Sequence, residues 1–244
     1  MTKQMTQKEF KRVETKYLVP KQCLPDLMAD LAVHLMEDTF ARSTITSLYF
    51  DTADFTMIQD SLAKKHGKEK VRLRTYAPKP LLTSPAFLEI KQKIAGIGYK
   101  YRVATTPAIA GKFLSGQGSK EIVDDRMMAQ LALLEKRYGT ITPRMLIAYK
   151  RQSFRGRNDH SVRVTVDTNL TYAEVNHLTL TSFEASPLLP QNQVVMEIKV
   201  EDQIPVWLQT ILETYNFEKV SFSKYGQAYQ LHQESQLSQE AHYA

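Results

Sequence analysis

Charged side chains alternate with apolar ones along several short segments, and these side chains are of types that bind and transfer phosphate. Arg72 and Arg74 share one face of segment 70–76, opposite Val71 and Leu73, because side chains two residues apart point the same way in a strand. Four other segments carry such sets: Arg12, Glu14 and Lys16; Glu89, Lys91 and Lys93; Arg163, Thr165 and Asp167; and Glu197, Lys199 and Glu201. Each segment predicts a strand with ionised groups along one face.

A single strand of this kind is most often the solvated face of an antiparallel sheet. Five of them, dominated by Arg, Lys and Glu rather than by Thr, Ser, Asn and Gln, favour another arrangement. A sheet closed into a barrel with these side chains inward would enclose a basic tunnel with a few carboxylates. Because enclosed like charges repel, such a tunnel requires a multivalent anion. A chain of phosphates, with a divalent metal on the carboxylates, meets that requirement.

These side chains need a sheet to position them, and the residue pattern predicts one. The predicted strands are 11–19, 45–50, 70–76, 87–93, 99–104, 144–154, 161–167 and 194–201. The predicted helices are 24–36, 54–65, 124–138 and 205–215. Loops are indicated at Thr106-Pro107, at 111–118 and at 186–190, Gly96-Ile97-Gly98 indicates a hairpin, and we expect the tail over about 233–244 to fray. Strands occur in both halves without a linker, which favours a single α+β domain over residues 1–244 built on a mainly antiparallel sheet.

Composition narrows the class of protein. The 244 residues are 43% hydrophobic and 24% charged, which argues against a disordered or fibrous chain. The net charge of +6 favours anionic partners. Cys23 is the single cysteine, so an internal disulfide and a Cys-based zinc site are excluded. The opening residues lack an apolar leader, and no run approaches the ~18 apolar residues of a membrane span. We therefore expect a cytoplasmic protein.

Eight segments, in order along the chain, resemble the VTC domain, the polyphosphate polymerase module of the vacuolar transporter chaperone complex and its bacterial relatives. This family lies within the CYTH-like (triphosphate tunnel metalloenzyme) superfamily. The segments are 10–19, 47–52, 71–76, 87–93, 149–151, 162–167, 196–199 and 222–225. The similarity covers roughly residues 9–230. It implies a closed, mainly antiparallel β-barrel tunnel of about eight strands with flanking helices, a bound Mn²⁺ or Mg²⁺, and ATP-dependent polyphosphate synthesis.

The resemblance also implies roles for individual residues. The matching phosphate-coordinating cations are Lys16, Arg72, Arg74, Lys91, Arg151, Arg163, Lys199 and Lys224. Tyr149 and Ser223 would add neutral hydrogen bonds to phosphate, and Glu197 matches the metal-binding carboxylate. Glu14 and Glu89 are weaker metal candidates, and we expect each to orient a neighbouring cation instead.

One departure from the wider superfamily concerns the first strand. Many CYTH-like hydrolases and cyclases begin with Glu-x-Glu-x-Lys, whereas this chain has Arg12, Glu14 and Lys16. One carboxylate on the metal side is therefore a cation, which puts a two-metal hydrolytic mechanism in doubt.

The function expected from the resemblance is transfer of the γ-phosphoryl group of ATP to a growing polyphosphate chain. Phosphoryl transfer needs positioning and charge neutralisation more than covalent help. A terminal phosphate nucleophile is already ionised, whereas hydrolysis needs a positioned water and a group to deprotonate it. Two alternatives stay open: a tripolyphosphatase or other triphosphate hydrolase on the same fold, and a non-catalytic module that binds polyphosphate or inositol phosphates.

The expected partners are ATP and inorganic polyphosphate. We expect no nucleic acid, because proteins that bind it usually expose basic patches with stacking aromatics on an open face. Translocation of the product would require a separate membrane protein, through which this chain would be membrane-associated.

Overall fold

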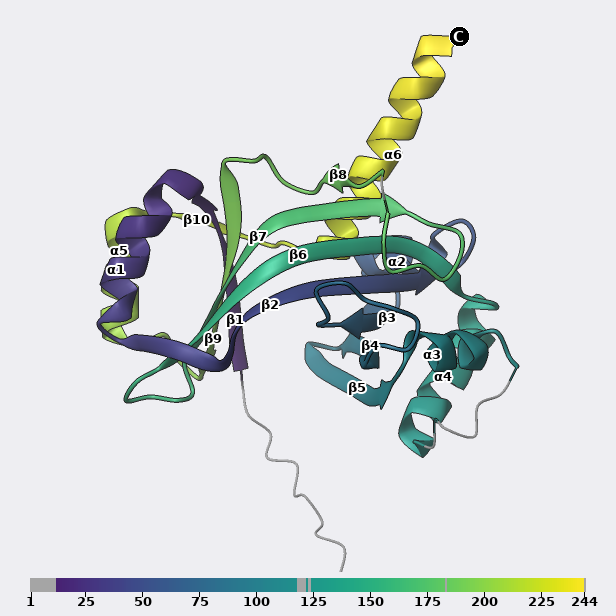
Figure 1. The fold of residues 1–244 in the computed structure, drawn as a ribbon, viewed down its shortest axis with the longest axis horizontal. Helices are drawn as coiled ribbons and strands as arrows, with labels where there is room; N and C mark the ends of the chain where they lie inside the picture. The colour runs from purple at the N-terminus through teal and green to yellow at the C-terminus, as the bar shows by residue number, and fades with distance from the viewer. Residues whose placement is uncertain (1–11, 118–121, 123, 183, 244) are drawn as a thin grey trace, which may run out of the picture. The chain divides into compact units, whose positions relative to one another are not determined.

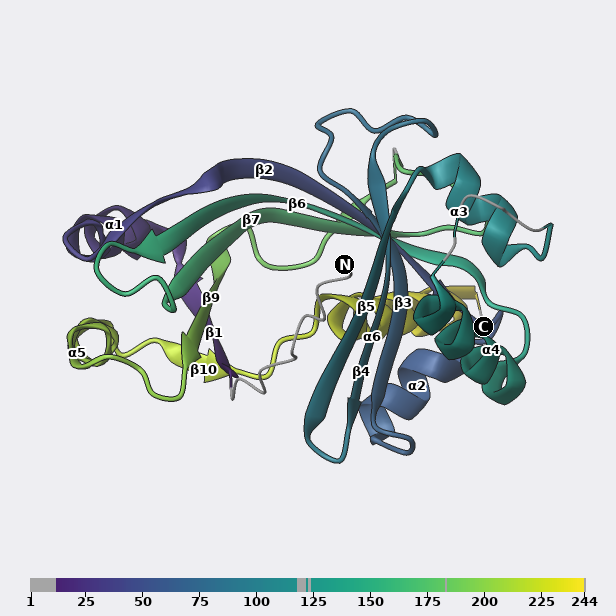
Figure 2. The same ribbon diagram turned by 90° about the horizontal axis from the view of Figure 1, so that it is seen from below.

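The computed structural model describes residues 12–117, 122, 124–182 and 184–243. The chain divides into two compact units. The first unit comprises Met1–Arg42, Arg151–Thr168 and Gln191–Ser221, and the second comprises Ser43–Lys150, Asn169–Pro190 and Phe222–Ala244. Figures 1 and 2 show the elements of each. The expectation of a single domain over residues 1–244 stays a prediction.

Strands β1, β9 and β10 and the first part of β7 are joined by ladders in the first unit. The bounds are β1 (Arg12–Pro20), η1 (Lys21–Cys23), α1 (Leu24–Ala32), β7 (Arg163–Glu174), β9 (Gln193–Glu201), α5 (Val206–Tyr215) and β10 (Glu218–Val220). All three ladders, β10–β1, β1–β9 and β9–β7, are antiparallel. Helices α1 and α5 lie side by side (Figures 1 and 2).

The core of the first unit fills with the apolar side chains that alternate with the charged ones. Val164, Met196 and Ile198 are fully buried, and they pack with Leu27 and Leu31 from one face of α1. Burial of apolar surface is what holds helix and sheet together. The alternation therefore sorts apolar residues toward the helices and charged residues to the other face of the sheet.

The second unit is built on antiparallel ladders joining β2, β3, β4 and β5. The bounds are β2 (Leu35–Asp51), α2 (Thr56–Ala63), β3 (Lys68–Thr75), β4 (Ala86–Ile94), β5 (Ile97–Thr105), α3 (Pro107–Leu114), α4 (Asp125–Tyr138), β6 (Thr142–Gly156), β8 (Ser186–Pro187) and α6 (Lys224–Tyr243). Strands β2 and β6, like β7, have residues in both units. The hairpin expected at Gly96-Ile97-Gly98 is confirmed, since Ile94 pairs with Ile97 across Ala95 and Gly96, both with positive φ.

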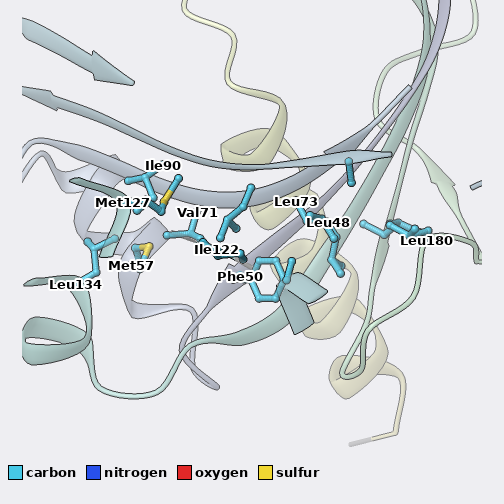
Figure 3. Packing of buried hydrophobic residues seen from close by; sticks show 14 of the residues in the cluster. Leu48, Phe50, Met57, Val71, Leu73, Ile90, Ile122, Met127, Leu134 and Leu180 are labelled. Atoms are coloured by element: carbon cyan, nitrogen blue, oxygen red, sulfur yellow. The ribbon is translucent and has the colours of Figure 1, made fainter. Parts of the chain in front are cut away.

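Figure 3 shows the core of the second unit. Leu48, Val71 and Leu73 come from the sheet and are fully buried, and Met127 and Leu134 come from the buried face of α4. Asp124 caps this helix by accepting a hydrogen bond from the Met127 amide at 2.7 Å. The capped amphipathic helix covers the apolar face of the sheet and leaves the other face to the charged residues.

The strands follow the order β10-β1-β9-β7-β6-β2-β3-β4-β5, with β8 paired to β7. The α+β class and the large antiparallel sheet are thus confirmed, but the expected closed barrel is wrong. The order ends at β10 and β5, and no ladder joins them in the part of the chain that the structure describes. Strand β10 has three residues, Glu218–Val220, and so short an edge offers little backbone for a further strand.

The eight predicted strands are all present, the first without Lys11, which lies outside the described residues. The helical predictions need three corrections. The helix expected over 24–36 ends at Ala32, and Leu35 begins β2 instead. The loop expected at Thr106-Pro107 and residues 111–114 of the loop expected over 111–118 form α3 instead, because Thr106 caps this helix by accepting from the Ile109 amide. Residues 115–117 form a turn, as expected, and residues 118–121 lie outside the described residues. The tail expected to fray is helical to Tyr243.

Candidate functional site: two clusters of charged side chains

The charged face of the first unit follows the register of β1, β9 and β7. Lys16 pairs with Glu197, which pairs with Thr165; Glu14 pairs with Lys199, which pairs with Arg163. These residues form two rows across three strands, on the face opposite Val13 and Thr15. We call the set Glu14, Lys16, Arg163, Glu197 and Lys199 the first-unit ladder.

Lys199 links the two carboxylates of the first-unit ladder. Its Nζ contacts Glu197 and lies 3.6 Å from Glu14 Oε2, and Lys16 Nζ lies 3.0 Å from Glu14 Oε1. Glu197 is 7% exposed. Burial raises the pKa of Glu197, but the charges of Lys199 and Lys16 outweigh burial and hold it below its usual value. Both carboxylates are therefore ionised at neutral pH and surrounded by cations.

The two arginines of the first unit differ in their surroundings. Arg151 donates from Nε and Nη2 to the two carboxylate oxygens of Asp167 at 2.6 and 2.8 Å, and Asp167 is fully buried. This bidentate pair fixes the guanidinium in one plane. Arg163 is exposed, with no ion-pair partner among the described residues. Arg163 is thus open to an anion, whereas Arg151 is oriented by Asp167.

The donor set for a metal in the first unit is small. Among the described residues, no group of three or more His, Cys, Asp or Glu side chains is placed to hold a metal ion. Glu197 and Glu14 already share the cation of Lys199. A hard divalent cation fits these two carboxylates only where phosphate oxygens supply its remaining ligands, because Mg²⁺ and Mn²⁺ need an oxygen-rich shell.

Arg72 and Arg74 lie side by side on β3 and are buried, with 7% and 8% of their surfaces exposed. The solvated outer face that the alternation alone would allow is excluded for them, because such a face leaves guanidinium groups in water. Arg74 donates to the hydroxyls of Ser47 and Tyr149, both at 3.2 Å. Arg72 donates to Tyr49 at 3.1 Å and to Glu89 at 2.7 Å.

Glu89 is the carboxylate at the centre of the second-unit cluster. It is fully buried and contacts Arg72 Nη2 at 2.6 Å, Lys100 Nζ at 2.8 Å and Arg102 Nε at 3.6 Å. Burial raises the pKa of Glu89, but Arg72, Arg74 and Lys100 together outweigh burial, and the pKa falls to about 2. With three cations around it, Glu89 has the surroundings of a group that orients cations rather than of a metal ligand.

Positive charge exceeds negative charge in this cluster, and two neighbouring pKa values reflect it. Burial alone raises the pKa of Tyr49, yet Arg72, Arg74 and Lys70 lower it to about 8. Desolvation, followed by the charges of Arg72 and Arg74, lowers the pKa of Lys91 to about 7. Because the Lys91 side chain is exposed, repulsion by the two guanidinium groups is the better supported cause. The cluster therefore favours an added anion.

The remaining predicted residues of the second unit gather at the start of α6. Ser223 accepts a hydrogen bond from Lys70 Nζ at 2.5 Å and one from the Gly226 amide at 3.1 Å. Lys224 Nζ lies 4.7 Å from the centre of the Tyr149 ring. Tyr149 is 3% exposed, and its hydroxyl accepts a hydrogen bond from Arg74. The structure thus brings Arg74, Tyr149, Ser223 and Lys224 into one connected group.

Sequence reasoning missed several side chains of these clusters: Ser47, Tyr49, Lys70, Lys100, Arg102 and Asp167 as a partner of Arg151. Alternation was a sufficient signal for three of them. Lys70 precedes Arg72 by two residues on β3, and Lys100 and Arg102 alternate along β5 in the same way. Ser47 and Tyr49 required the β2–β3 register, which pairs them with Arg74 and Arg72. The register itself cannot be read from one strand.

Comparison with known proteins gives one family. The VTC domain family model matches residues 11–233. Vacuolar transporter chaperone complex subunit 4 of Schizosaccharomyces pombe is 24% identical over 270 residues, which cover 90% of this chain and 37% of that protein. The subunit of the same name from Trypanosoma brucei brucei is 24% identical over 269 residues, or 89% of this chain and 34% of that protein. The chain therefore spans about a third of the length of these relatives.

A solved structure gives the same fold. A proposed adenylate cyclase from Bacillus halodurans superposes with a TM-score of 0.52 at 15% identity, covering 87% of this chain and 93% of that chain. At this identity the likeness shows the fold alone, and the CYTH-like fold expected from the resemblance is confirmed apart from closure. In the part of the chain that the structure describes, no helix has the length and hydropathy to cross a bilayer.

Proposed function

The chain belongs to the VTC domain family, and from that premise we propose that it is an ATP-dependent polyphosphate polymerase. It would transfer the γ-phosphoryl group of ATP to the terminal phosphate of a growing polyphosphate chain. The observation that carries the proposal is the buried pair Arg72 and Arg74, placed on one strand face with positive charge in excess around it. A polyanion relieves that excess, and neither guanidinium can lose its proton to relieve it.

The residues of the second-unit cluster would act by binding and orienting phosphate. Arg72 and Arg74 would bind neighbouring phosphates through planar forks, which hold two oxygens each. Lys91, Lys224 and the Ser223 hydroxyl would neutralise or hydrogen-bond the remaining oxygens. Alignment of donor and acceptor phosphates in line is most of what phosphoryl transfer requires.

The first-unit ladder would bind the metal and further phosphates. Glu197 would be the first carboxylate on Mn²⁺ or Mg²⁺ and Glu14 the second, with phosphate oxygens completing the shell. The bound metal would supply charge neutralisation to the phosphate oxygens that the first-unit ladder binds. Lys16, Lys199, Arg163 and Arg151 would bind phosphate oxygens beside it, and Asp167 would hold Arg151 in its plane.

Hydrolysis on the same residues is the second candidate, and the carboxylates argue against it. Glu89 and Asp167 are fully buried and paired with arginines, and Glu197 contacts Lys199. A carboxylate engaged in this way is a poor base toward water. Polymerisation needs no such base, because the attacking phosphate is already ionised.

The names of the relatives suggest that this chain has protein partners. The two relatives are named as subunits of a vacuolar transporter chaperone complex. We propose that this chain too works beside other subunits. We place it in the cytoplasm, with a separate membrane protein to carry the product.

Incubation with ATP and Mn²⁺, followed by measurement of ADP, orthophosphate and long anionic polymer, tests the proposal. Polymerase activity gives ADP and polymer in proportion to the phosphoryl groups transferred. Orthophosphate without polymer would assign the chain as a hydrolase. Polyphosphate binding without either product would assign it as a binding module.

A further inference from the structure

The charged face of the second unit ends in an aromatic pair. Tyr76 follows β3 directly, two residues beyond Arg74, and is 37% exposed. Its ring meets that of Phe87 nearly edge-on, with centres 6.1 Å apart and an angle of 74° between the planes. Phe87 is the register partner of Arg74 on β4. An accessible aromatic ring thus lies beside the guanidinium for which a phosphate is proposed.

Arg102 brings a guanidinium to the same pair. Its Cζ lies 3.6 Å from the centre of the Phe87 ring and 5.9 Å from that of Tyr76. Its Nε is 3.6 Å from Glu89, longer than the 2.8 Å contact that Lys100 makes with the same carboxylate oxygen. Arg102 therefore stacks on the Phe87 ring, while Lys100 makes the shorter contact with the carboxylate. Aromatic rings and guanidinium planes are the surfaces on which proteins stack nucleobases.

The opposite end of this face carries lysines instead of aromatic rings. There the register pairs Lys70 with Lys91 and Lys68 with Lys93. Lysines suit phosphates, because each is a point charge, but they offer no ring for a base. The face therefore has a direction, from an aromatic end at Tyr76 past the two arginines to a lysine end.

We propose that Tyr76, held by Phe87 and Arg102, is the stacking surface for the nucleobase of a nucleoside triphosphate whose phosphates lie along Arg74 and Arg72. The inference rests on the proposed function and adds to it a direction: the nucleoside lies at Tyr76 and the terminal phosphate points toward Lys70 and Lys91. Successive side chains on one strand face are ~7 Å apart. A nucleoside joined to a phosphate at Arg74 therefore reaches the neighbouring position.

Two probes separate recognition of the base from recognition of the phosphates: a non-hydrolysable ATP analogue and inorganic tripolyphosphate. In equilibrium binding, Tyr76→Ala is expected to lower the affinity for the analogue about 5- to 150-fold, the range that loss of base–aromatic stacking gives. Tripolyphosphate affinity should stay within about two-fold. Tyr76→Phe keeps the ring and should bind both probes as the wild-type chain does.

Tyr99→Ala is the matched control. Tyr99 is 40% exposed, close to the value for Tyr76, and it registers with Gln92 on the face opposite Lys91 and Lys100. Its removal should change neither affinity.

Three results would overturn the subsite. Tyr76→Ala could keep the wild-type affinity for the analogue, or it could lower the affinities for both probes equally. Tyr76→Phe could also lose as much affinity for the analogue as Tyr76→Ala. The last two would show that Tyr76 acts through Arg74 rather than by stacking. A wild-type chain that binds neither probe would overturn the proposed function itself, and it would do so before any variant is compared.

Discussion

At the scale of single residues, the two buried arginines of β3 hold different partners. Arg74 donates to the neutral hydroxyls of Ser47 and Tyr149, whereas Arg72 shares the buried carboxylate of Glu89 with Lys100. A hydroxyl does not neutralise a guanidinium, so Arg74 keeps its charge for a ligand. Arg72 stabilises the folded protein as well as binding the ligand, because its loss would remove one of the cations that neutralise the buried carboxylate of Glu89.

Arg74→Ala therefore separates ligand binding from stability. Loss of a charge-assisted hydrogen bond to phosphate costs ~1.5–3 kcal/mol, which lowers kcat/KM on the order of 10- to 150-fold. Arg74→Lys keeps the charge but not the planar fork of the guanidinium, so its kcat/KM should lie between the wild-type and Arg74→Ala values. The melting temperature without ligand should change little, and the stabilisation by a non-hydrolysable ATP analogue should shrink.

Arg72→Ala is the companion variant, and it should lower the melting temperature of the free protein as well. The interpretation of Arg74 would be contradicted if Arg74→Ala unfolded at a markedly lower temperature yet kept full activity per folded molecule. Arg74 would then be structural.

Glu197→Gln tests the metal assignment. The amide keeps the shape of the side chain but removes the charge that a hard cation requires. Activity titrated against Mn²⁺ should lose its metal-dependent part, while circular dichroism stays unchanged. Near wild-type rates at every Mn²⁺ concentration would show that Glu197 serves to pair with Lys199 instead.

The lowered pKa of Lys91 predicts how phosphate binding depends on pH. Repulsion by Arg72 and Arg74 lowers the pKa of Lys91 in the free protein, so its ammonium loses its proton at a lower pH than that of an ordinary lysine. A bound polyanion favours the charged form, so binding takes up a proton and tripolyphosphate affinity falls as pH rises through the lowered pKa of Lys91.

Lys91→Arg provides the comparison for this pH dependence, because arginine stays charged throughout the range. Calorimetry in two buffers of different ionisation enthalpy should show less proton uptake for Lys91→Arg than for wild type. Equal uptake would place the titrating group elsewhere, with Tyr49 as the next candidate, since its pKa is about 8.

At the scale of elements, eight strands followed from alternation and from β-branched and aromatic content. Strands β8 and β10 and the first part of β2 were not predicted, and the helices followed only in part. The 124–138 prediction was confirmed as α4, with its cap at Asp124. Helix α3 was missed because Gly111 suggested a loop, yet a Cβ at Gly111 would approach Leu178 Cδ2 to 2.7 Å. The packing of a neighbour, which the sequence does not display, keeps this helical position small. Thr106-Pro107 was the available signal, as a cap followed by proline in the first turn.

The start of α6 is held by a buried carboxylate. The Tyr225 hydroxyl donates to Asp51 Oδ2 at 2.7 Å, and Asp51 also accepts from the Met57 and Ile58 amides at the start of α2. The rings of Tyr225 and Tyr49 stack with centres 4.6 Å apart. Asp51 thus connects two helices, one of which carries Ser223 and Lys224 at its beginning.

Tyr225→Phe should therefore lower the free energy of unfolding by about 1–3 kcal/mol, the cost of removing a hydrogen bond to a buried charged group. Urea denaturation measures it. Tyr229→Phe, on the same helix, is the control, since the Tyr229 ring packs against Phe55 at 5.4 Å and little change is expected. Equal stabilities of the two variants would show that Asp51 does not hold α6.

At the scale of the whole molecule, the predicted phosphate-binding residues divide between the two compact units. Lys16, Arg151, Arg163 and Lys199 belong to the first, with Glu197. The second holds Arg72, Arg74, Lys91 and Lys224. The face of the sheet on which most of them lie was predictable, because alternation fixes it. Their partners were not, because ion pairs such as Arg151 with Asp167 depend on cross-strand geometry and on burial.

The most direct test of polyphosphate synthesis follows the phosphoryl group itself. Parallel reactions with ATP labelled with ³²P at the γ or at the α position, each with Mn²⁺, should give a long polymer that carries the γ label and lacks the α label. The polymer should be degraded by a polyphosphatase, and Arg74→Ala should make far less of it. Appearance of the γ label in orthophosphate, with none in polymer at any time point, would contradict polyphosphate synthesis by this chain.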